Sequence, residues 1–380
     1  MGILLFAGPN AGMCLTFSSH FSPFPPAPMP LSPSPAPLDP VALTMDLARI
    51  PSVSGQEGEV VGFVDELLRG RGWEVHRIPV SPGRDDVLAT TGTAPVLTFS
   101  THLDTVPPFI APRFDGDRLS GRGSCDAKGI AAAMLCAAER LRAEGVPVAL
   151  LFVIGEESTH DGATAANDVT TTSRVLINGE PTERILATGT KGALVAVLRT
   201  MGRAAHSAYP HLGHSATRDL VQLLATLDSL VLPTDPVLGP TTVNIGMLSG
   251  GLAENVVAPA AEARLMIRLV GPAGVIESKL RDWAEPKGNL EFARLVPPVH
   301  LKTVPGFETG VVAYATDIPR LTNWGTPYLF GPGSIHVAHT DHEYVSVADL
   351  LHAVDDYVRL ARAALAAAGE SAGSPTVTAG

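Results

Sequence analysis

Acidic and histidine side chains stand at the ends of apolar segments throughout this sequence. The run "LLFVIG" leads directly into two adjacent acids, Glu156 and Glu157. Because ligands bind beyond the carboxyl ends of strands in an open α/β sheet, such positions predict one shared site. The other positions of this kind are His102 and Asp104 in "LTFSTHLD", Asp126 in "GRGSCDAKG", Glu180 in "INGEPT", and His336, His339, His342 and Glu343 in "GPGSIHVAHTDHEYV".

These residue types are the ligands of a hydrolytic metal site. Imidazole and carboxylate without cysteine suit zinc, or manganese or cobalt in its place. Two metals need about six or seven ligand atoms, which a bridging carboxylate helps to supply, and one remaining acid could act as general base. His102 and Asp104 face the same side of an extended strand, so Asp104 could hold the second nitrogen of His102.

Each segment also has an ordinary structural interpretation. Charged residues are mostly surface residues, so the Glu156–Glu157 pair could be a solvated turn. Asp126 could be the N-cap of the helix that follows it. Glu180 could be a turn acid, and the three late histidines could lie in a solvated loop. The recurrence of metal-binding types at five strand ends favours the metal site.

Helices and strands alternate from about residue 41 and must position these side chains. The apolar periodicity predicts strands over 73–80, 94–104, 148–157 and 174–181, and an alanine-rich helix over 128–145 that closes at a glycine. A further helix is predicted over 59–70. This alternation predicts an α/β domain with a mostly parallel central sheet.

A different order of elements between about 190 and 290 predicts a second, smaller domain. Strand, helix, strand, strand, helix and strand follow one another, which is the split βαβ arrangement. The predicted catalytic domain therefore consists of 41–189 and 291–368, with 190–290 inserted. The low-complexity end 369–380 is predicted to be disordered.

The first forty residues are predicted to be an extended tail. Nine prolines between 21 and 40 exclude a helix or a central strand there. Translation that begins at Met29 or Met45 is an alternative explanation of this segment.

Composition excludes several classes of function. The chain has 380 residues and a net charge of -11, which argues against nucleic acid or an anionic membrane as its partner. The cysteines Cys14, Cys125 and Cys136 form no CxxC pair, so we expect no disulfide framework and a cytoplasmic location. No apolar run approaches the roughly 18 to 20 residues that span a bilayer.

In combination, the motifs resemble the metallopeptidase M20 family. "STHLDTVPP", "GRGSCDAKGI", "GEES", "GEPT", "GRAAHSAYP" and "AHTDHEYV" occur in the family's order and spacing, over about residues 41–368. The family contains acetylornithine deacetylase, succinyl-diaminopimelate desuccinylase, aminoacylase and glutamate carboxypeptidase. The resemblance implies a zinc-peptidase-like catalytic domain, an inserted ferredoxin-like α+β lid and dimerisation domain, and a homodimer.

The resemblance also implies a role for each acid and histidine of the site. Two divalent metal ions, zinc or cobalt or manganese, would share Asp126 as a bridging ligand. The remaining ligands would be His102 and Glu180 on one metal, and Glu157 and His339 on the other.

Glu156 would be the general base that passes a proton to the leaving amine, and Asp104 would orient His102. A cis peptide bond is implied between Asp126 and Ala127.

Three residues of the inserted domain would contact the substrate. His206 would reach the partner subunit's site and stabilise the oxyanion. Asn255 and Arg268 would grip the substrate's carboxylate, for which arginine is suited by its bidentate fork. Without the resemblance, His206 is a turn histidine and Arg268 a surface strand arginine, since Met266 stands where relatives have an acid.

From this resemblance we expect a two-metal amidohydrolase that removes the acyl group from an N-acyl-L-amino acid. The late histidine segment most resembles the acetylornithine deacetylase branch, which would serve arginine or lysine biosynthesis. The alternatives are an M20 dipeptidase or carboxypeptidase, and a non-catalytic amino-acid-binding scaffold. A serine hydrolase is poorly supported, because "GHSAT" lacks the closing glycine of a nucleophile elbow.

Overall fold

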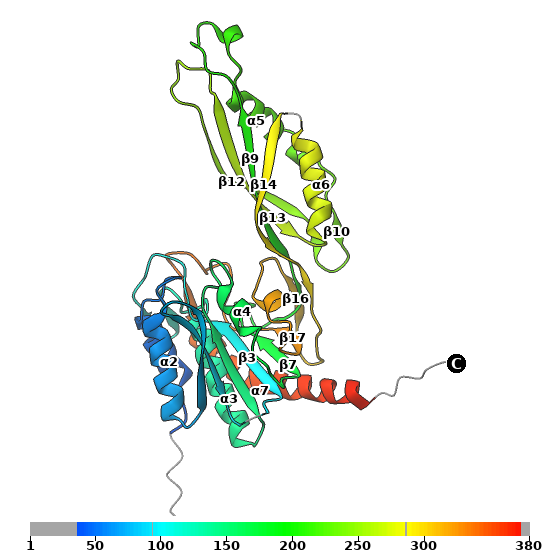
Figure 1. The fold of residues 1–380 in the computed structure, drawn as a ribbon. Coiled ribbons are helices and arrows are strands. Elements are labelled where there is room, and N and C mark those ends of the chain that lie inside the picture. Colours follow the sequence, from blue (N-terminus) through cyan, green and yellow to red (C-terminus); the bar gives the residue numbers. More distant parts are fainter. Residues whose placement is uncertain (1–35, 93, 286, 374–380) are drawn as a thin grey trace, which may run out of the picture. The chain divides into compact units, whose positions relative to one another are not determined.

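A six-stranded sheet forms the centre of the larger domain (Figure 1). The structure is a computed structural model that describes residues 36–92, 94–285 and 287–373. In spatial order the strands are β1 (Glu74–Ser81), β2 (Arg84–Thr90), β6 (Val148–Val153), β3 (Leu97–His102), β7 (Val175–Asn178) and β17 (Thr326–Leu329). The last four are parallel to one another, whereas β1 and β2 are antiparallel to their neighbours. The carboxyl ends of the parallel strands therefore meet at one edge of the sheet.

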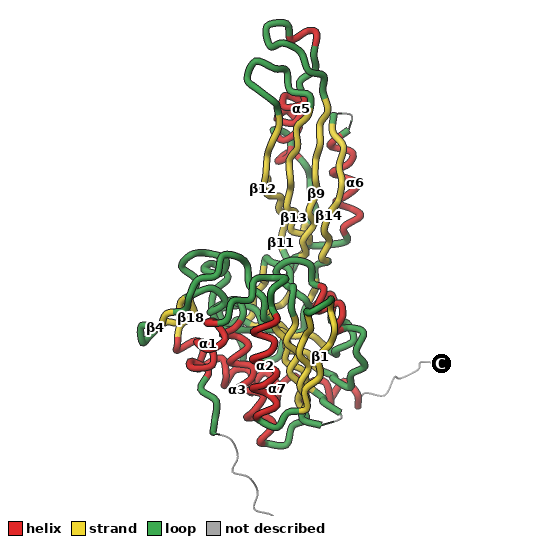
Figure 2. Tube along the Cα trace, turned by 60° about the vertical axis from the view of Figure 1, so that its left-hand side comes forward, coloured by secondary structure: helices red, strands yellow, loops and turns green. Residues whose placement is uncertain are grey.

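Helices cover both faces of this sheet because its central strands are apolar. Every residue of β3 and β6 is buried. Figure 2 shows helices side by side on one face, and the core beneath them includes Phe99 and Tyr357. On the other face a smaller core contains Trp324 and the short α4 (Asp161–Ala166). The four helices are α1 (Pro40–Arg49), α2 (Gly58–Gly70), α3 (Lys128–Ala143) and α7 (Val347–Gly373).

The lid domain is a four-stranded antiparallel sheet with two helices on one face (Figure 1). Its elements follow the order β-α-β-β-α-β, and the strands lie in the spatial order β12-β13-β9-β14. Buried leucines and alanines of the sheet pack against α5 and α6, which leaves the other face of the sheet open. The elements are β9 (Gly192–Met201), α5 (Ala216–Leu224), β12 (Thr242–Gly250), β13 (Ala260–Leu269), α6 (Ala273–Ala284) and β14 (Gly288–Val296).

The remaining elements are short. They form two three-stranded sheets and one two-stranded ribbon. Their strands are β4 (Arg113–Phe114), β5 (Arg118–Ser120) and β18 (Tyr344–Ser346); β15 (Val299–His300), β8 (Leu186–Thr190) and β16 (Thr309–Val312); and β10 (Thr234–Asp235) and β11 (Gly239–Pro240). The 3-10 turns are η1 (Pro210–Leu212), η2 (Leu227–Ser229) and η3 (Ile318–Arg320).

These elements confirm the predicted fold class, a mostly parallel α/β domain with an inserted α+β domain. One expectation differs in detail. Helix α7 continues to Gly373, past the predicted end at 368, because a helix that has already formed extends more easily than a new one begins. Most of the predicted tails, 1–35 and 374–380, lies outside the described residues. No helix in the described part of the chain has the length and apolarity needed to cross a membrane.

Candidate metal and catalytic site

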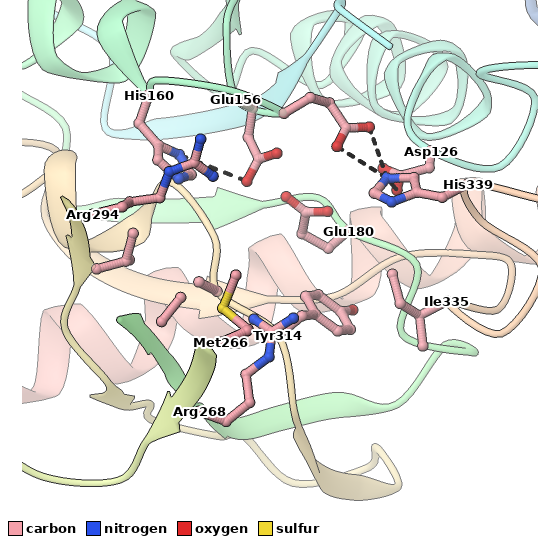
Figure 3. A pocket seen from close by; sticks show the side chains of 14 residues that line it. Asp126, Glu156, His160, Glu180, Met266, Arg268, Arg294, Tyr314, Ile335 and His339 are labelled. Atoms are coloured by element: carbon pink, nitrogen blue, oxygen red, sulfur yellow. Dashed lines mark hydrogen bonds and ion pairs between the residues drawn. The ribbon is translucent and has the colours of Figure 1, made fainter. Parts of the chain in front are cut away.

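Asp126, Glu156, Glu157 and Glu180 line a single pocket together with His339 (Figure 3). Glu156 and Glu157 follow β6, and Glu180 follows β7, so two parallel strands on either side of β3 deliver them to the same edge of the sheet. Asp126 comes from the loop before α3, and His339 from the loop before β18.

Asp126 lies between two histidines. Its Oδ1 atom is 3.0 Å from His102 Nε2, and its Oδ2 atom is 3.3 Å from His339 Nε2. The same nitrogen of His339 lies 2.9 Å from the Glu157 carboxylate. His102, Asp126 and Glu157 each place one ligand atom within 4.8 Å of the others. The Asp126 carboxylate thus presents one oxygen beside His102 and the other beside His339, which is the arrangement that a bridging ligand needs.

The loop that carries Asp126 is held by the buried Glu343. Glu343 Oε1 accepts hydrogen bonds from the backbone N–H groups of Cys125 and Asp126, both at 3.1 Å, and Arg122 pairs with Oε2 at 2.6 Å. The peptide bond between Asp126 and Ala127 is cis, which confirms that prediction. The helix α3 has Ala127 at its N-cap position with no side-chain cap, so the N-cap interpretation of Asp126 is wrong.

Asp104 holds the backbone of the two adjacent glutamates. Its carboxylate accepts hydrogen bonds from the N–H groups of Glu156 at 3.1 Å and Glu157 at 3.2 Å, and from Ser54 Oγ at 2.6 Å. The ring of His102 donates from Nδ1 to the backbone carbonyl of Asp104 at 2.9 Å, and the carboxylate is farther away, at 3.5 Å. Asp104 therefore orients His102 mainly through its main chain, and uses its side chain to position Glu156 and Glu157.

The pair Glu156–Glu157 is not a solvated turn. The exposed fractions of the two side chains are 12% and 7%. Gly155 before them has a φ of 73°, and a Cβ atom there would lie 2.1 Å from Asp161 Oδ1. Only glycine fits this close approach, and the sharp turn at Gly155 directs both acids into the pocket instead of into solvent.

Crowding of negative charge dominates the electrostatics of the pocket. Burial raises the pKa of Glu156 and of Glu180 well above the usual range, and nearby carboxylates raise both further. Hydrogen bonds with Asp126 and Glu157 raise the pKa of His339 to about 10. Within residues 36–92, 94–285 and 287–373, no lysine or arginine forms an ion pair with Asp126, Glu156, Glu157 or Glu180.

Lys128, two residues after Asp126, does not supply the missing positive charge. Its ammonium group donates to the carbonyl of Ile50 at 2.6 Å, and burial lowers its pKa to about 7. Four carboxylates and two imidazoles without a neutralising side chain match the ligands that divalent metal ions prefer. The residues of the pocket therefore fit a metal site.

A second histidine–aspartate pair adjoins Glu156 and was not predicted. His160 Nδ1 lies 2.8 Å from Asp317 Oδ1 and 3.7 Å from Glu156 Oε1, and both His160 and Asp317 are buried. His160 follows Glu156 by four residues, so the one available signal was the spacing that brings side chains together across a helical turn. No sequence signal links Asp317 to His160, because 157 residues separate them.

The predicted residues of the lid divide into two groups. Arg268 lines the pocket, whereas His206 and Asn255 do not. Those two lie together, since Ser207 N–H donates to the Asn255 carbonyl at 2.9 Å. Ala193, at the first end of β9, lines the pocket, whereas His206 and Asn255 lie beyond the other end of this strand. The ten residues of β9 span about 30 Å, and this length separates the two residues from the pocket.

Four further residues are His336, His342, Tyr314 and Arg294. His336 and His342 are exposed and do not line the pocket, so His339 is the histidine of its segment that does. Tyr314 and Arg294 line the pocket and were not predicted. Their positions depend on long-range packing, for which the sequence around them carries no motif.

Comparisons with known proteins identify the family of this chain. The family model described as "Peptidase family M20/M25/M40" matches residues 98–363. A protein of Aspergillus terreus named probable carboxypeptidase is 40% identical and covers 84% of this chain and 85% of its own. A peptidase M20 domain-containing protein of Schizosaccharomyces pombe is also 40% identical, over 84% and 83% of the two chains. These names favour the carboxypeptidase alternative over the expected acetylornithine deacetylase branch.

Solved structures share the fold at low sequence identity. A tripeptidase of Staphylococcus aureus superimposes with a TM-score of 0.73 at 19% identity, covering 86% of this chain and 97% of its own. An M20 family metallo-carboxypeptidase of Sulfolobus solfataricus has a TM-score of 0.69 at 18% identity, over 86% and 99% of the chains. The chain belongs to peptidase family M20/M25/M40 and is a hydrolytic enzyme that acts on amide bonds.

Proposed function

We propose that this enzyme is a two-metal exopeptidase of carboxypeptidase or dipeptidase type, which cleaves the amide bond next to a free C-terminal carboxylate. The observation that carries the proposal is the division of the Asp126 carboxylate between His102 and His339 in a pocket of four acids. Relatives named probable carboxypeptidase, at 36% to 40% identity over most of both chains, support the choice of peptide substrates.

The buried acids and histidines would hold the two metal ions. Asp126 would bind both, since each of its oxygens already faces a different histidine. The further ligands would be His102 and Glu180 for one ion, and Glu157 and His339 for the other. Zinc, cobalt and manganese all accept such ligands. Two bound cations would polarise the amide carbonyl and make an attacking water more acidic.

Glu156 would move the proton. It lies 3.7 Å from His160 Nδ1, and burial with the charges of Glu180 and Asp317 raises its pKa well above the usual range. A carboxylate of raised pKa takes a proton from the attacking water more readily and can return it to the leaving amine. Asp104 fixes the backbone from which this side chain projects.

A substrate panel tests the proposal. We expect protein loaded with zinc or cobalt to cleave N-acylated dipeptides or free dipeptides at the C-terminal residue. N-acetylornithine should have a kcat/KM at least tenfold lower. Cleavage of N-acetylornithine alone would overturn the exopeptidase proposal in favour of deacetylation. Failure to cleave any of these amides would overturn both.

Metal binding is tested independently of turnover. Calorimetric titration of chelator-treated protein should show two zinc ions per chain, and thermal unfolding should shift to higher temperature when they bind. Asp126→Asn should lose both effects, because its side chain serves both ions. One ion per chain would contradict the bridging role of Asp126.

We also propose that the enzyme is a homodimer that pairs through β12. This strand is at the edge of the lid sheet, and its exposed side chains include Ile245, Met247 and Leu248. An exposed apolar edge strand is a surface for pairing with another chain. In a dimer, His206 could reach the partner's pocket, as it cannot in its own chain.

Mixed dimers test this arrangement. Glu156→Gln and His206→Ala proteins should each be inactive, and a mixture refolded together should regain up to about a quarter of the wild-type activity. No recovery, or a monomer in sedimentation experiments, would contradict the proposed dimer.

A further inference from the structure

The lid sheet presents two arginines without protein partners to the acidic pocket. Arg268 on β13 and Arg294 on β14 both line it. Their neighbours on the intervening strand β9 are Ala193 and Val195. In the part of the chain that the structure describes, neither guanidinium forms an ion pair or a side-chain hydrogen bond.

An arginine farther along the same sheet face has its charge neutralised by acids on the neighbouring strands. Arg199 on β9 pairs with Glu262 on one side at 2.8 Å and with Glu291 on the other side at 2.6 Å. Toward the pocket the neighbouring acids disappear: Met266 stands two residues before Arg268, opposite Val195. The two charges nearest the pocket are therefore left for a ligand.

A β-bulge directs Arg294 to this face. The register between β14 and β9 shifts between Phe292 and Arg294, so Arg294 lies opposite Val195. Without the extra residue, Ala293 would occupy that place and Arg294 would point to the opposite face. Bulges that redirect a side chain are enriched beside functional sites.

The two arginines flank the pocket at a spacing that suits a small ligand. They lie two strands and two residues apart, which places their Cα atoms about 12 Å from each other. Figure 3 shows the Arg294 guanidinium on the side of Glu156 and His160, and the Arg268 guanidinium beside Tyr314. Each side chain is long enough to reach toward the other over Met266.

We propose that Arg294 binds a second carboxylate of the substrate, in addition to the C-terminal carboxylate held by Arg268, so that the enzyme prefers dicarboxylic substrates. This inference rests on the proposed exopeptidase function. A guanidinium binds a carboxylate through two parallel hydrogen bonds, which an isosteric amide cannot reproduce. The second carboxylate can belong to the side chain of the released residue or to the acyl group.

Two pairs of isosteric substrates separate these sources. Alanyl-glutamate against alanyl-glutamine varies the released residue, and N-succinyl-alanine against N-succinamoyl-alanine varies the acyl group. We expect wild-type enzyme to prefer the acid at least tenfold in kcat/KM in one pair. Arg294→Gln should remove most of that preference through KM, and change kcat/KM for the matching amide less than about twofold.

Arg264→Gln is the matched control. Arg264 lies on β13 on the same sheet face as Arg268, and it does not line the pocket. This substitution removes the same charge at a position outside the pocket, so the acid preference should be unchanged. Thermal unfolding of both variants would verify that the exposed positions tolerate glutamine.

The outcomes distinguish this inference from the proposed function. If the amides are cleaved as well as the acids, or if Arg264→Gln lowers the acid preference as much as Arg294→Gln, the second-carboxylate site is wrong and the exopeptidase stands. If wild-type enzyme cleaves none of the four substrates or the wider panel, the exopeptidase proposal fails and the inference fails with it.

Discussion

Charged groups are held differently in the catalytic pocket and on the open face of the lid sheet. Around the pocket, Asp104 accepts three hydrogen bonds and Glu343 accepts two from the backbone and one from Arg122, and both acids are buried. On the lid sheet, Arg199 is 43% exposed, and Arg294 has no protein partner in the described ranges. Proton transfer requires groups fixed in place, whereas recognition requires groups left free to bind. The comparison predicts large effects in the pocket and small ones on the lid.

Glu156→Gln should have the largest effect. Glutamine keeps the size of the side chain but cannot accept a proton, so kcat should fall about a thousandfold, which corresponds to about 4 kcal/mol of transition-state stabilisation. KM and the calorimetric metal stoichiometry should change little, because Glu156 is not among the proposed ligands. Steady-state kinetics on the preferred dipeptide would measure this.

The exposed Glu66 on α2 provides a control for this change. Glu66→Gln should leave kcat and KM at the wild-type values. A Glu156→Gln protein with more than a tenth of wild-type kcat would assign the proton transfer to another group, and His160 would be the first to examine.

Glu343→Leu should have the next largest effect, this time on stability. Leucine leaves the N–H groups of Cys125 and Asp126 without an acceptor and the Arg122 guanidinium without its carboxylate. We expect the free energy of unfolding to fall by roughly 3 kcal/mol, at the low end of the range for a broken buried pair, because Arg122 still donates to the Pro108 and Thr340 carbonyls. Urea denaturation of metal-free protein would measure it. A loss below about 1 kcal/mol would show that burial does not strengthen this contact.

The strand ends and the fold class could be predicted from the sequence. Apolar runs such as "VALLFVIG" must be buried, and the acids that follow them must reach the carboxyl edge of the sheet. The resemblance added the order of the ligands and the cis bond at Asp126, which no periodicity contains. The strand β2 was not predicted, because it begins with Arg84, Asp85 and Asp86 and depends on pairing with β1 and β6.

Long-range contacts could not be predicted from the sequence. Asp104 reaches Glu156 across 52 residues, and Glu343 reaches Asp126 across 217. Neither contact has a local signature, because both depend on how loops from different strands pack together. The position of Arg294 depends in the same way on a bulge, which appears only in the register with β9.

The comparisons favour the carboxypeptidase alternative over the acetylornithine deacetylase branch, and the preference for that branch has a related physical reason. The motifs that favoured the acetylornithine deacetylase branch lie around the metal ligands, and these residues serve any amide that the family cleaves. Selection among amides depends on groups that contact the ends of the substrate, which is the role that we propose for Arg268 and Arg294 on the lid. These arginines lie outside the catalytic domain, so motifs around the metal ligands carry little information about them.

Arg199→Gln should have the smallest effect, although it removes two ion pairs at once. Both pairs are exposed, with 35% of the Glu262 side chain and 63% of the Glu291 side chain accessible, so water screens most of the attraction. The two glutamates that remain lie on strands about 10 Å apart, and their repulsion is weak at that distance. We expect the free energy of unfolding to stay close to the wild-type value, and the difference to shrink further in 0.5 M salt. Urea denaturation at both salt concentrations, with kcat/KM as a second measurement, would check this. A loss as large as that of Glu343→Leu would mean that the exposed ion pairs of the lid sheet stabilise the fold as much as the buried contacts around the pocket do. The two regions would then not differ in how strongly their charged groups are held.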